Sequence, residues 1–419
     1  MSELKAGTGL RLQLLFIAAA CAWLLSAPAA AEDEEEKRPQ ATMTERAYKR
    51  LLQAQELLGN SQYDEALSRL RAMEKMDLNN YERALVYQTI GFVFAQQGKY
   101  PDAIRNFEAC LALDALPSTA QQGMLYSLAS LYMAQDQFQK TIDTLKRWLV
   151  NEKDPKPDAF IMMASSYASM NDYRNALPWA KRAVDASPEP KENWYQLLVA
   201  IHFELQQYRD AAGVLTKVVG YWPGKISYWE MLFGAYQQLQ DDQQALATLN
   251  LAYDNGLITE EKKILNLVRM RLFVNVPFFA GELLEKEMAA GRVERNEKNL
   301  DLLLSAWTTA REYDKAIAVI NQLAPLKNNG ELYLQQAQLY NEKNDWSGVA
   351  ASVQKALDKG NLKSTGKAYL LQGLAFSEQK KFQEAIASFR RAQQFEETRS
   401  QAAGWMEYVN EQISIRVAS

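Results

Sequence analysis

The side chains that most often perform enzyme chemistry are scarce in this sequence. Its 419 residues contain a single histidine, His202, and two cysteines, Cys21 and Cys110. A zinc site of His and Cys ligands is therefore excluded, and a serine hydrolase would depend on His202 alone as its base. The sequence contains no glycine-rich phosphate loop and no G-x-S-x-G motif. We expect no catalytic site, no metal and no cofactor.

The charge balance argues against nucleic-acid binding. The chain has 47 basic and 51 acidic side chains, a net charge of −4, so no excess of positive charge is present to neutralise phosphates. Hydrophobic residues make up 48% of the sequence and charged residues 23%, a composition typical of a folded soluble protein. Composition thus leads away from catalysis and from nucleic acids.

Residues 1–31 are typical of a secretory signal peptide. A positively charged start precedes an apolar run over residues 12–25, and small residues follow up to Ala31. Ala29 and Ala31 both fit as the last residue before cleavage. The alternative is an uncleaved anchor, although the run approaches the ~20 apolar residues of a membrane span only when the alanines are counted. We expect an exported protein whose mature part begins with an acidic linker, residues 32–43.

One residue pattern recurs along the rest of the chain. An aromatic residue is followed three positions later by a small residue and then, four positions further on, by an apolar one, as in Tyr100, Ala103 and Phe107. The positions equivalent to Ala103 are 66, 103, 141, 176, 211, 245, 280, 316, 349 and 385. The pattern therefore occurs ten times, at a period close to 34 residues.

Each copy also has an upstream half with the spacing of a helix face. In the clearest example, Tyr87, Ile90, Gly91 and Phe94 are three or four residues apart and so lie on one side of a helix. A small residue such as Gly91 allows a second helix to approach closely. The pattern predicts a pair of packed helices in every copy.

This pattern resembles the tetratricopeptide repeat (TPR), whose consensus has these residue types at this period. The resemblance covers residues 47–395 and implies an all-α fold, a right-handed superhelical solenoid of about ten helix-turn-helix repeats. We assign the TPR array to residues 44–395 and a C-terminal capping helix to residues 396–419.

Both ends of the array have a predicted cap. Thr42 and Glu45 fit a capping box at the start of the first helix. At the other end, Trp405, Val409 and Ile413 share one face of the terminal helix.

His202 and Cys110 are interpreted as packing residues. His202 has the place of Phe94 and Tyr132 in sister repeats, and Cys110 has the place of Ala183 and other alanines. Once the signal peptide is removed Cys110 is the only cysteine, so no disulfide can form within the exported chain.

The seventh repeat, residues 262–291, departs most from the pattern. Val268 replaces the small residue, Arg271 the aromatic residue and Glu287 the later alanine, while three phenylalanines, Phe273, Phe278 and Phe279, surround its turn. Two interpretations remain open. The repeat is either a degenerate copy that still packs in phase, or a bend or contact site where local rules are broken for function.

The TPR resemblance implies that a partner binds in a concave groove lined by the first helix of each repeat. Mapping that face selects a candidate groove patch across repeats two to five: Phe92, Tyr126, Met133, Ile161 and Phe203. The groove positions of these repeats have no Lys or Arg, which disfavours a ligand recognised by its carboxylate. In repeats seven and eight the corresponding surface is basic, with Lys262, Arg269 and Lys298, and there an acidic partner is the better expectation.

The order of signal peptide, repeats and cap is similar to that of envelope TPR proteins of Gram-negative bacteria, and more narrowly of those that accompany TonB-type energy-transducing transport systems. The resemblance implies a non-enzymatic periplasmic scaffold that binds an envelope protein or peptide segment. Nucleic acids and small-molecule cofactors are not expected as partners, and membrane contact is expected only through a partner or an uncleaved signal segment. The alternative is a general periplasmic assembly or chaperone factor for envelope proteins or cell-wall enzymes.

Overall fold

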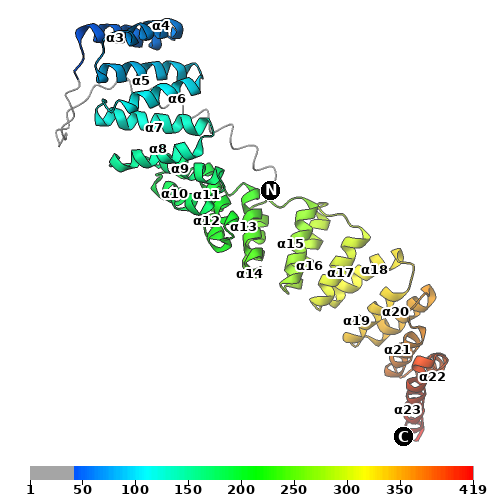
Figure 1. The fold of residues 1–419 in the computed structure, drawn as a ribbon. Helices are drawn as coiled ribbons and strands as arrows, with labels where there is room; N and C mark the ends of the chain where they lie inside the picture. Colours follow the sequence, from blue (N-terminus) through cyan, green and yellow to red (C-terminus); the bar gives the residue numbers. More distant parts are fainter. Residues whose placement is uncertain (1–41, 419) are drawn as a thin grey trace. The chain divides into compact units, whose positions relative to one another are not determined.

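The computed structural model describes residues 42–418, and its side chains up to residue 415 (Figure 1). The signal-peptide prediction, 1–31, and nearly all of the acidic linker lie outside the described residues. Every regular element between residues 42 and 418 is a helix, which confirms the all-α fold class. None of these helices is both long enough and apolar enough to cross a membrane.

The chain divides into two compact units, residues 1–221 and 222–419. The first contains α3 (Glu45–Gly59), α4 (Tyr63–Glu74), α5 (Asn80–Gln96), α6 (Tyr100–Ala112), α7 (Ser118–Ala134), α8 (Phe138–Asn151), α9 (Pro157–Ser169), α10 (Tyr173–Ala186), α11 (Glu192–Glu204) and α12 (Tyr208–Tyr221).

The second unit contains α13 (Ile226–Gln238), α14 (Asp242–Asp254), α15 (Glu261–Phe273), α16 (Pro277–Ala289), α17 (Glu297–Thr309), α18 (Tyr313–Leu323), α19 (Glu331–Glu342), α20 (Trp346–Lys359), α21 (Thr365–Glu378), α22 (Phe382–Ala392) and α23 (Arg399–Ala418). Short 3₁₀ turns, η2 (Ala324–Leu326) and η3 (Glu396–Thr398), follow α18 and α22. From α3 to α22 the helices form ten pairs, which we call helix A and helix B of each repeat.

The turn between helix A and helix B has the same conformation in all ten repeats. One residue in each turn has a positive φ, near +60° in most of them. These residues are Ser61, Gly98, Asp136, Asn171, Gln206, Gln240, Asn275, Arg311, Asn344 and Lys380. Each lies five positions before the small residue that defines the sequence repeat. The backbone therefore repeats in the phase that the sequence pattern predicts.

A hydrogen bond closes each of these turns. The amide of the residue after the positive-φ position donates to the carbonyl five residues earlier, as from Lys99 to Phe94 and from Val276 to Arg271, both at 2.9 Å. This is the Schellman arrangement, which satisfies carbonyl groups at a helix C-terminus. Helix A thus ends at the same register in every repeat.

Small residues allow helices A and B to approach closely. A Cβ atom added to Gly91 would lie 2.3 Å from the ring of Phe107, and one added to Gly373 would lie 2.5 Å from that of Phe389. Both phenylalanine rings are fully buried. The small residue of helix A and the aromatic residue of helix B are therefore complementary parts of one contact.

The first helix begins differently from the prediction. Thr44 is its N-cap and accepts from Ala47, so a capping box of Thr42 and Glu45 is wrong. The Glu82 carboxylate on α5 accepts from both the backbone N–H and the hydroxyl of Thr44, each at 2.7 Å. Burial acts to raise the pKa of Glu82, but these bonds hold it below its usual value. A buried carboxylate in the second repeat therefore fixes the start of the first.

The terminal helix α23 covers the last repeat. Val409 and Ala402 are fully buried and pack with Phe389 of α22, and Ile413 is half-buried on the same side. The Trp405 ring stacks on Phe389 with a centroid separation of 6.3 Å, although its outer side is exposed.

The turn conformation predicts the effect of replacing its one glycine. Gly98 has a φ of +71°, whereas Gly59 at the end of α3 does not have a positive φ, and neither has an atom within 4 Å of an added Cβ. A left-handed conformation costs a non-glycine residue roughly 1–2 kcal/mol, so Gly98→Ala should destabilise the fold by about 1 kcal/mol. Gly59→Ala should be neutral or stabilising. Thermal unfolding followed by circular dichroism checks both, and equal effects of the two would contradict the turn assignment.

Candidate functional site

The residues that could do chemistry are part of the core. His202 is buried, and its Nδ1 lies 2.9 Å from the amide oxygen of Gln207 in the same turn. Cys110 is fully buried, and burial raises the pKa of its thiol to about 12, so the reactive thiolate is suppressed. The prediction that both residues serve packing is confirmed. No group of side chains in residues 42–415 has the arrangement of a metal site.

Four of the predicted groove residues, Phe92, Tyr126, Met133 and Phe203, are half-buried and engaged within their own unit. Phe92 packs edge to face on Phe107, with ring centroids 5.1 Å apart. The Tyr126 ring lies 5.4 Å from that of Trp148, and burial, reinforced by the charge of Asp158, raises its pKa to about 12. Both Phe92 and Tyr126 pack against the core of the first unit, so packing accounts for part of their apolar character.

Met133 and Phe203 are placed in a similar way. The Met133 sulfur accepts from the Ser166 hydroxyl at 3.3 Å, and the Phe203 ring lies 6.0 Å from that of Tyr208. Both keep part of their surface exposed. That a partner binds at Phe92, Tyr126, Met133 and Phe203 stays a prediction.

Ile161 is a correction to the predicted groove patch. Its side chain is only 2% exposed and packs in a cluster with Phe160, Ala183 and Trp194. This cluster joins α9 to α10 and α11 at a position that helical spacing alone assigns to the groove. Ile161 is therefore a core residue and does not present a surface to a partner.

A cleft of about 610 Å³ lies in the second unit between α13 and α15. On α15, Asn266, Arg269, Met270 and Phe273 follow one another at the spacing of a single helix face, and Phe233 and Gln237 do the same on α13. Gln240 and Asp242 close one end. The walls thus combine apolar side chains with amide groups, one guanidinium and the Asp242 carboxylate, so they suit a polypeptide better than a rigid apolar ligand.

A second hollow adjoins the α13–α15 cleft. It shares Gln240, Asp242 and Phe273 with the cleft and extends over the turn at Val274 and Asn275. Beyond that turn, Phe279 is 55% exposed, and Phe273 is 70% exposed. Exposed aromatic rings beside an open cleft are typical of a protein-binding surface.

Phe278 differs from its two neighbours because it is anchored. Its ring packs edge to face on Trp307 of α17 at 5.8 Å and on Phe279 at 5.7 Å. The Lys315 ammonium lies 4.8 Å from the Phe278 centroid. Phe278 therefore holds this turn against the next repeat, and Phe273 and Phe279 are the rings left for a partner.

The unusual polar residues of the seventh repeat replace apolar contacts with hydrogen bonds. Arg271, at the aromatic position, donates to the Asn250 side chain from Nε and Nη2 and to the Phe279 carbonyl from Nη1. Glu287, at the alanine position, is fully buried, accepts from the Tyr253 hydroxyl at 2.6 Å and pairs with Arg292. The repeat thus packs in phase with its neighbours, as expected of a degenerate copy. It also has exposed aromatic rings, which suit the alternative interpretation as a contact site.

The three predicted basic residues, Lys262, Arg269 and Lys298, are all exposed. Arg269 lines the α13–α15 cleft, and Lys262 lies on the same face of α15, seven residues earlier. Lys298 has the same place on α17 as Lys262 on α15. The sequence analysis did not identify Phe233, Gln237 and Asn266 as parts of this site. Asn266 is three residues before Arg269, and Phe233 and Gln237 are seven and three residues before Gln240, so helical spacing could have indicated them.

Two models of the tetratricopeptide repeat family match the chain, over residues 157–190 and 334–402. The first segment spans α9 and α10, and the second begins in α19 and ends in α23. The described helices thus have the fold of a tetratricopeptide-repeat solenoid, and these two segments match the repeat family itself. No curated protein matches its sequence.

Solved structures that are similar to this chain include MamA, YrrB and part of a TPR protein from Cytophaga hutchinsonii. MamA is 20% identical over 41% of this chain and 91% of its own, with a TM-score of 0.35. YrrB, described as a TPR protein with an unusual peptide-binding site, is 18% identical over 44% and 90%, with a TM-score of 0.36. The C-terminal part of a TPR protein from Cytophaga hutchinsonii is 14% identical over 74% and 100%, with a TM-score of 0.37.

The buried carboxylate of the seventh TPR predicts a pH-dependent stability. Hydrogen bonding from Arg292 lowers the pKa of Glu287 against the opposing effect of burial. Ionised Glu287 therefore stabilises the folded state above the ordinary pKa of a glutamate, and this contribution is lost as the pH falls through the lowered folded-state pKa. Glu287→Gln should lower the melting temperature at pH 7 and have a smaller effect near pH 3. Exposed Glu285→Gln on the same helix is the control, and equal effects of Glu287→Gln at both pH values would contradict this role.

Proposed function

We propose that this TPR protein is a non-enzymatic scaffold that binds a segment of a partner protein at the α13–α15 cleft and its exposed phenylalanines. The observation behind this proposal is the exposure of Phe273, which lines that cleft, and of Phe279, which follows the adjoining turn. The hydrogen bonds of Arg271 and Glu287 already hold the seventh repeat in phase, so packing does not require two exposed rings there. The half-buried residues Tyr126 and Phe203 of the first unit form the second candidate surface.

We further propose that the scaffold acts in the periplasm, as an accessory component of a TonB-type energy-transducing transport system. The support is in the sequence: a signal-peptide pattern over residues 1–31, followed by an array that resembles the TPR proteins accompanying such systems. The partner would be an envelope protein of that system.

A general periplasmic assembly or chaperone factor is the alternative function. A client-handling factor would bind many envelope proteins, whereas an accessory component would bind one defined partner. Neighbouring genes separate the two inexpensively, because a TonB-type cassette favours the first function and an outer-membrane assembly gene favours the second.

Site-specific photo-crosslinking tests where the partner binds. A photoreactive side chain at position 273 or 279 should crosslink to one and the same partner, and a side chain at position 251 should not. Leu251 is a matched control because it is 53% exposed in the same unit but lies on α14 and lines neither the α13–α15 cleft nor the adjoining hollow. Crosslinks from positions 126 and 203 alone would reject the cleft and support the surface in the first unit.

Truncation of the two rings provides the quantitative prediction. The double variant Phe273→Ala with Phe279→Ala should weaken binding of the crosslinked partner. Each ring that acts as an anchor should account for about 2 kcal/mol, which is roughly a 30-fold loss of affinity per ring. Leu251→Ala should leave affinity unchanged. Isothermal titration calorimetry with the purified partner measures the effect, and circular dichroism verifies that each variant retains its helices.

The localisation has its own test. If the signal peptide is cleaved, protein recovered from periplasmic fractions should have an intact mass that corresponds to a start at residue 30 or 32. A full-length species that sediments with membranes would instead show that residues 1–31 remain as an anchor.

A further inference from the structure

Four side chains form a stripe along the exposed face of α15. Lys262, Asn266, Arg269 and Phe273 are separated by four, three and four residues, the spacing that aligns side chains on one side of a helix. All four are exposed. The stripe therefore presents, in order, a cation, an amide, a second cation and an aromatic ring.

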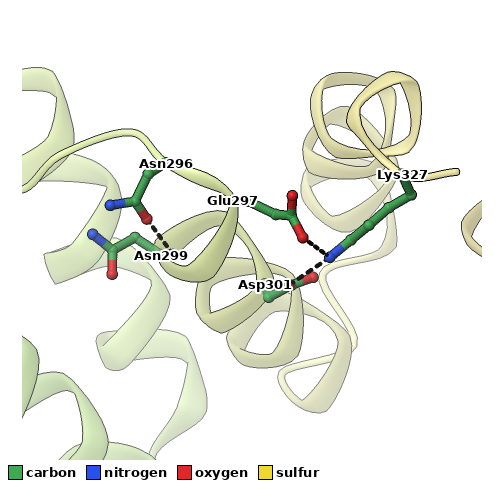
Figure 2. A network of polar contacts seen from close by, with 5 residues as sticks. All are labelled: Asn296, Glu297, Asn299, Asp301 and Lys327. Carbon is green, nitrogen blue, oxygen red and sulfur yellow. Dashed lines mark hydrogen bonds and ion pairs between the residues drawn. The ribbon is translucent and has the colours of Figure 1, made fainter.

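The carboxylates near this stripe are already engaged. Glu230 pairs with Lys263 at 3.0 Å, and Glu261 accepts from the Asn299 amide at 2.9 Å. In the next repeat Lys327 bridges Glu297 and Asp301, while Asn296 caps α17 (Figure 2). These contacts join the helix A of one repeat to the following repeat.

The cations of the stripe have no such partners. Within residues 42–415, Lys262, Arg269 and Lys298 form no ion pair. Across the cleft, Asp241 is the N-cap of α14 and accepts from Gln244, and Asp242 occupies the first turn, where the positive end of the helix dipole compensates its charge. The stripe and Lys298 thus form a local positive surface on a chain whose net charge is negative.

We infer that the partner segment, whose binding site rests on the proposed function above, is an acidic, extended peptide with one apolar anchor. Along α15, Lys262 and Arg269 are about 10 Å apart and Phe273 lies about 6 Å further on, at 1.5 Å per residue. An extended chain advances about 3.3 Å per residue. Side chains of an extended chain alternate between its two faces, so those that meet one stripe are an even number of residues apart. Two carboxylates four residues apart, about 13 Å, are within reach of the long side chains of Lys262 and Arg269, and a large apolar side chain two residues later, about 7 Å further on, reaches Phe273.

The amides of the site complete this match. Asn266 lies between the two cations, and Gln237 and Gln240 face it across the cleft. Amide side chains both donate and accept, so they suit the alternating N–H and C=O groups of an extended backbone. Single cations spaced along one helix fit separate carboxylates better than they fit a continuous phosphate backbone.

Defined peptides test this inference without knowledge of the natural partner. The probe is a fluorescent serine-based peptide with two glutamates four positions apart and a leucine two positions beyond the second, so that all three side chains share one face of the extended chain. Matched peptides carry glutamine or lysine in place of both glutamates, or serine in place of the leucine. With the full chain, fluorescence anisotropy should show the glutamate–leucine peptide binding at least about tenfold more tightly than each of the others, and this preference should weaken with rising salt.

Variants of the stripe connect the binding to these residues. Lys262→Gln and Arg269→Gln should each weaken the glutamate–leucine peptide several-fold, and Arg269→Glu should shift the preference toward the lysine peptide. Arg390→Gln, an exposed cation on helix B of the last repeat, should have no effect. Phe273→Ala should reduce affinity for the glutamate–leucine peptide and leave affinity unchanged for the peptide that has serine in place of the leucine.

The outcomes separate this inference from the function on which it rests. Equal binding of the glutamate and glutamine peptides, or no binding of any peptide, would overturn an acidic partner, yet crosslinks from positions 273 and 279 would still support the cleft as the binding site. Loss of those crosslinks as well would overturn both. Self-association that Arg269→Glu abolishes would identify a second copy of the chain as the occupant and would also overturn the inference.

Discussion

The turn between the two helices of each repeat determines the phase in which their apolar faces meet. A left-handed residue ends helix A, a backbone hydrogen bond closes the turn, and five residues later a small side chain on helix B meets the preceding helix. A residue such as Lys380 or Gln206 adopts this conformation at a cost. Since no single helical pair can bury its apolar face, the cost is offset only when every pair presents that face to the next in the same phase.

The seventh repeat shows how much side-chain chemistry can change while that phase is kept. Its turn at Asn275 has the common geometry, yet an arginine and a glutamate occupy positions that elsewhere are aromatic and small. Both are satisfied, Arg271 by Asn250 and a backbone carbonyl, Glu287 by Tyr253 and Arg292. A buried charge is tolerated when it is paired and hydrogen-bonded, so these substitutions preserve the stacking.

The replacement of apolar contacts by the hydrogen bonds of Arg271 and Glu287 also explains how an open surface can exist within a continuous array. Polar contacts directed toward α14 and α16 hold the seventh repeat, and the rings of Phe273 and Phe279 remain on its outside. On the neighbouring helices, carboxylates such as Glu230 and Glu297 are paired with lysines of the following repeats. The same inter-repeat contacts that stabilise the stack therefore leave an aromatic and basic surface on α15.

The sequence by itself determined the number of repeats, the position of each turn and the packing role of His202 and Cys110, because all of these depend on contacts within one period. It could not determine which residues on the outer side of helix A remain exposed. Ile161 is buried in a cluster that includes Trp194 of the following repeat, and Thr44, the N-cap of the first helix, is bound by Glu82 of the second repeat. The α13–α15 cleft and the ion pairs of Glu230 and Glu297 likewise join side chains about one period apart. Only the tertiary structure decides such contacts, since each depends on the size and charge of a side chain in a different repeat.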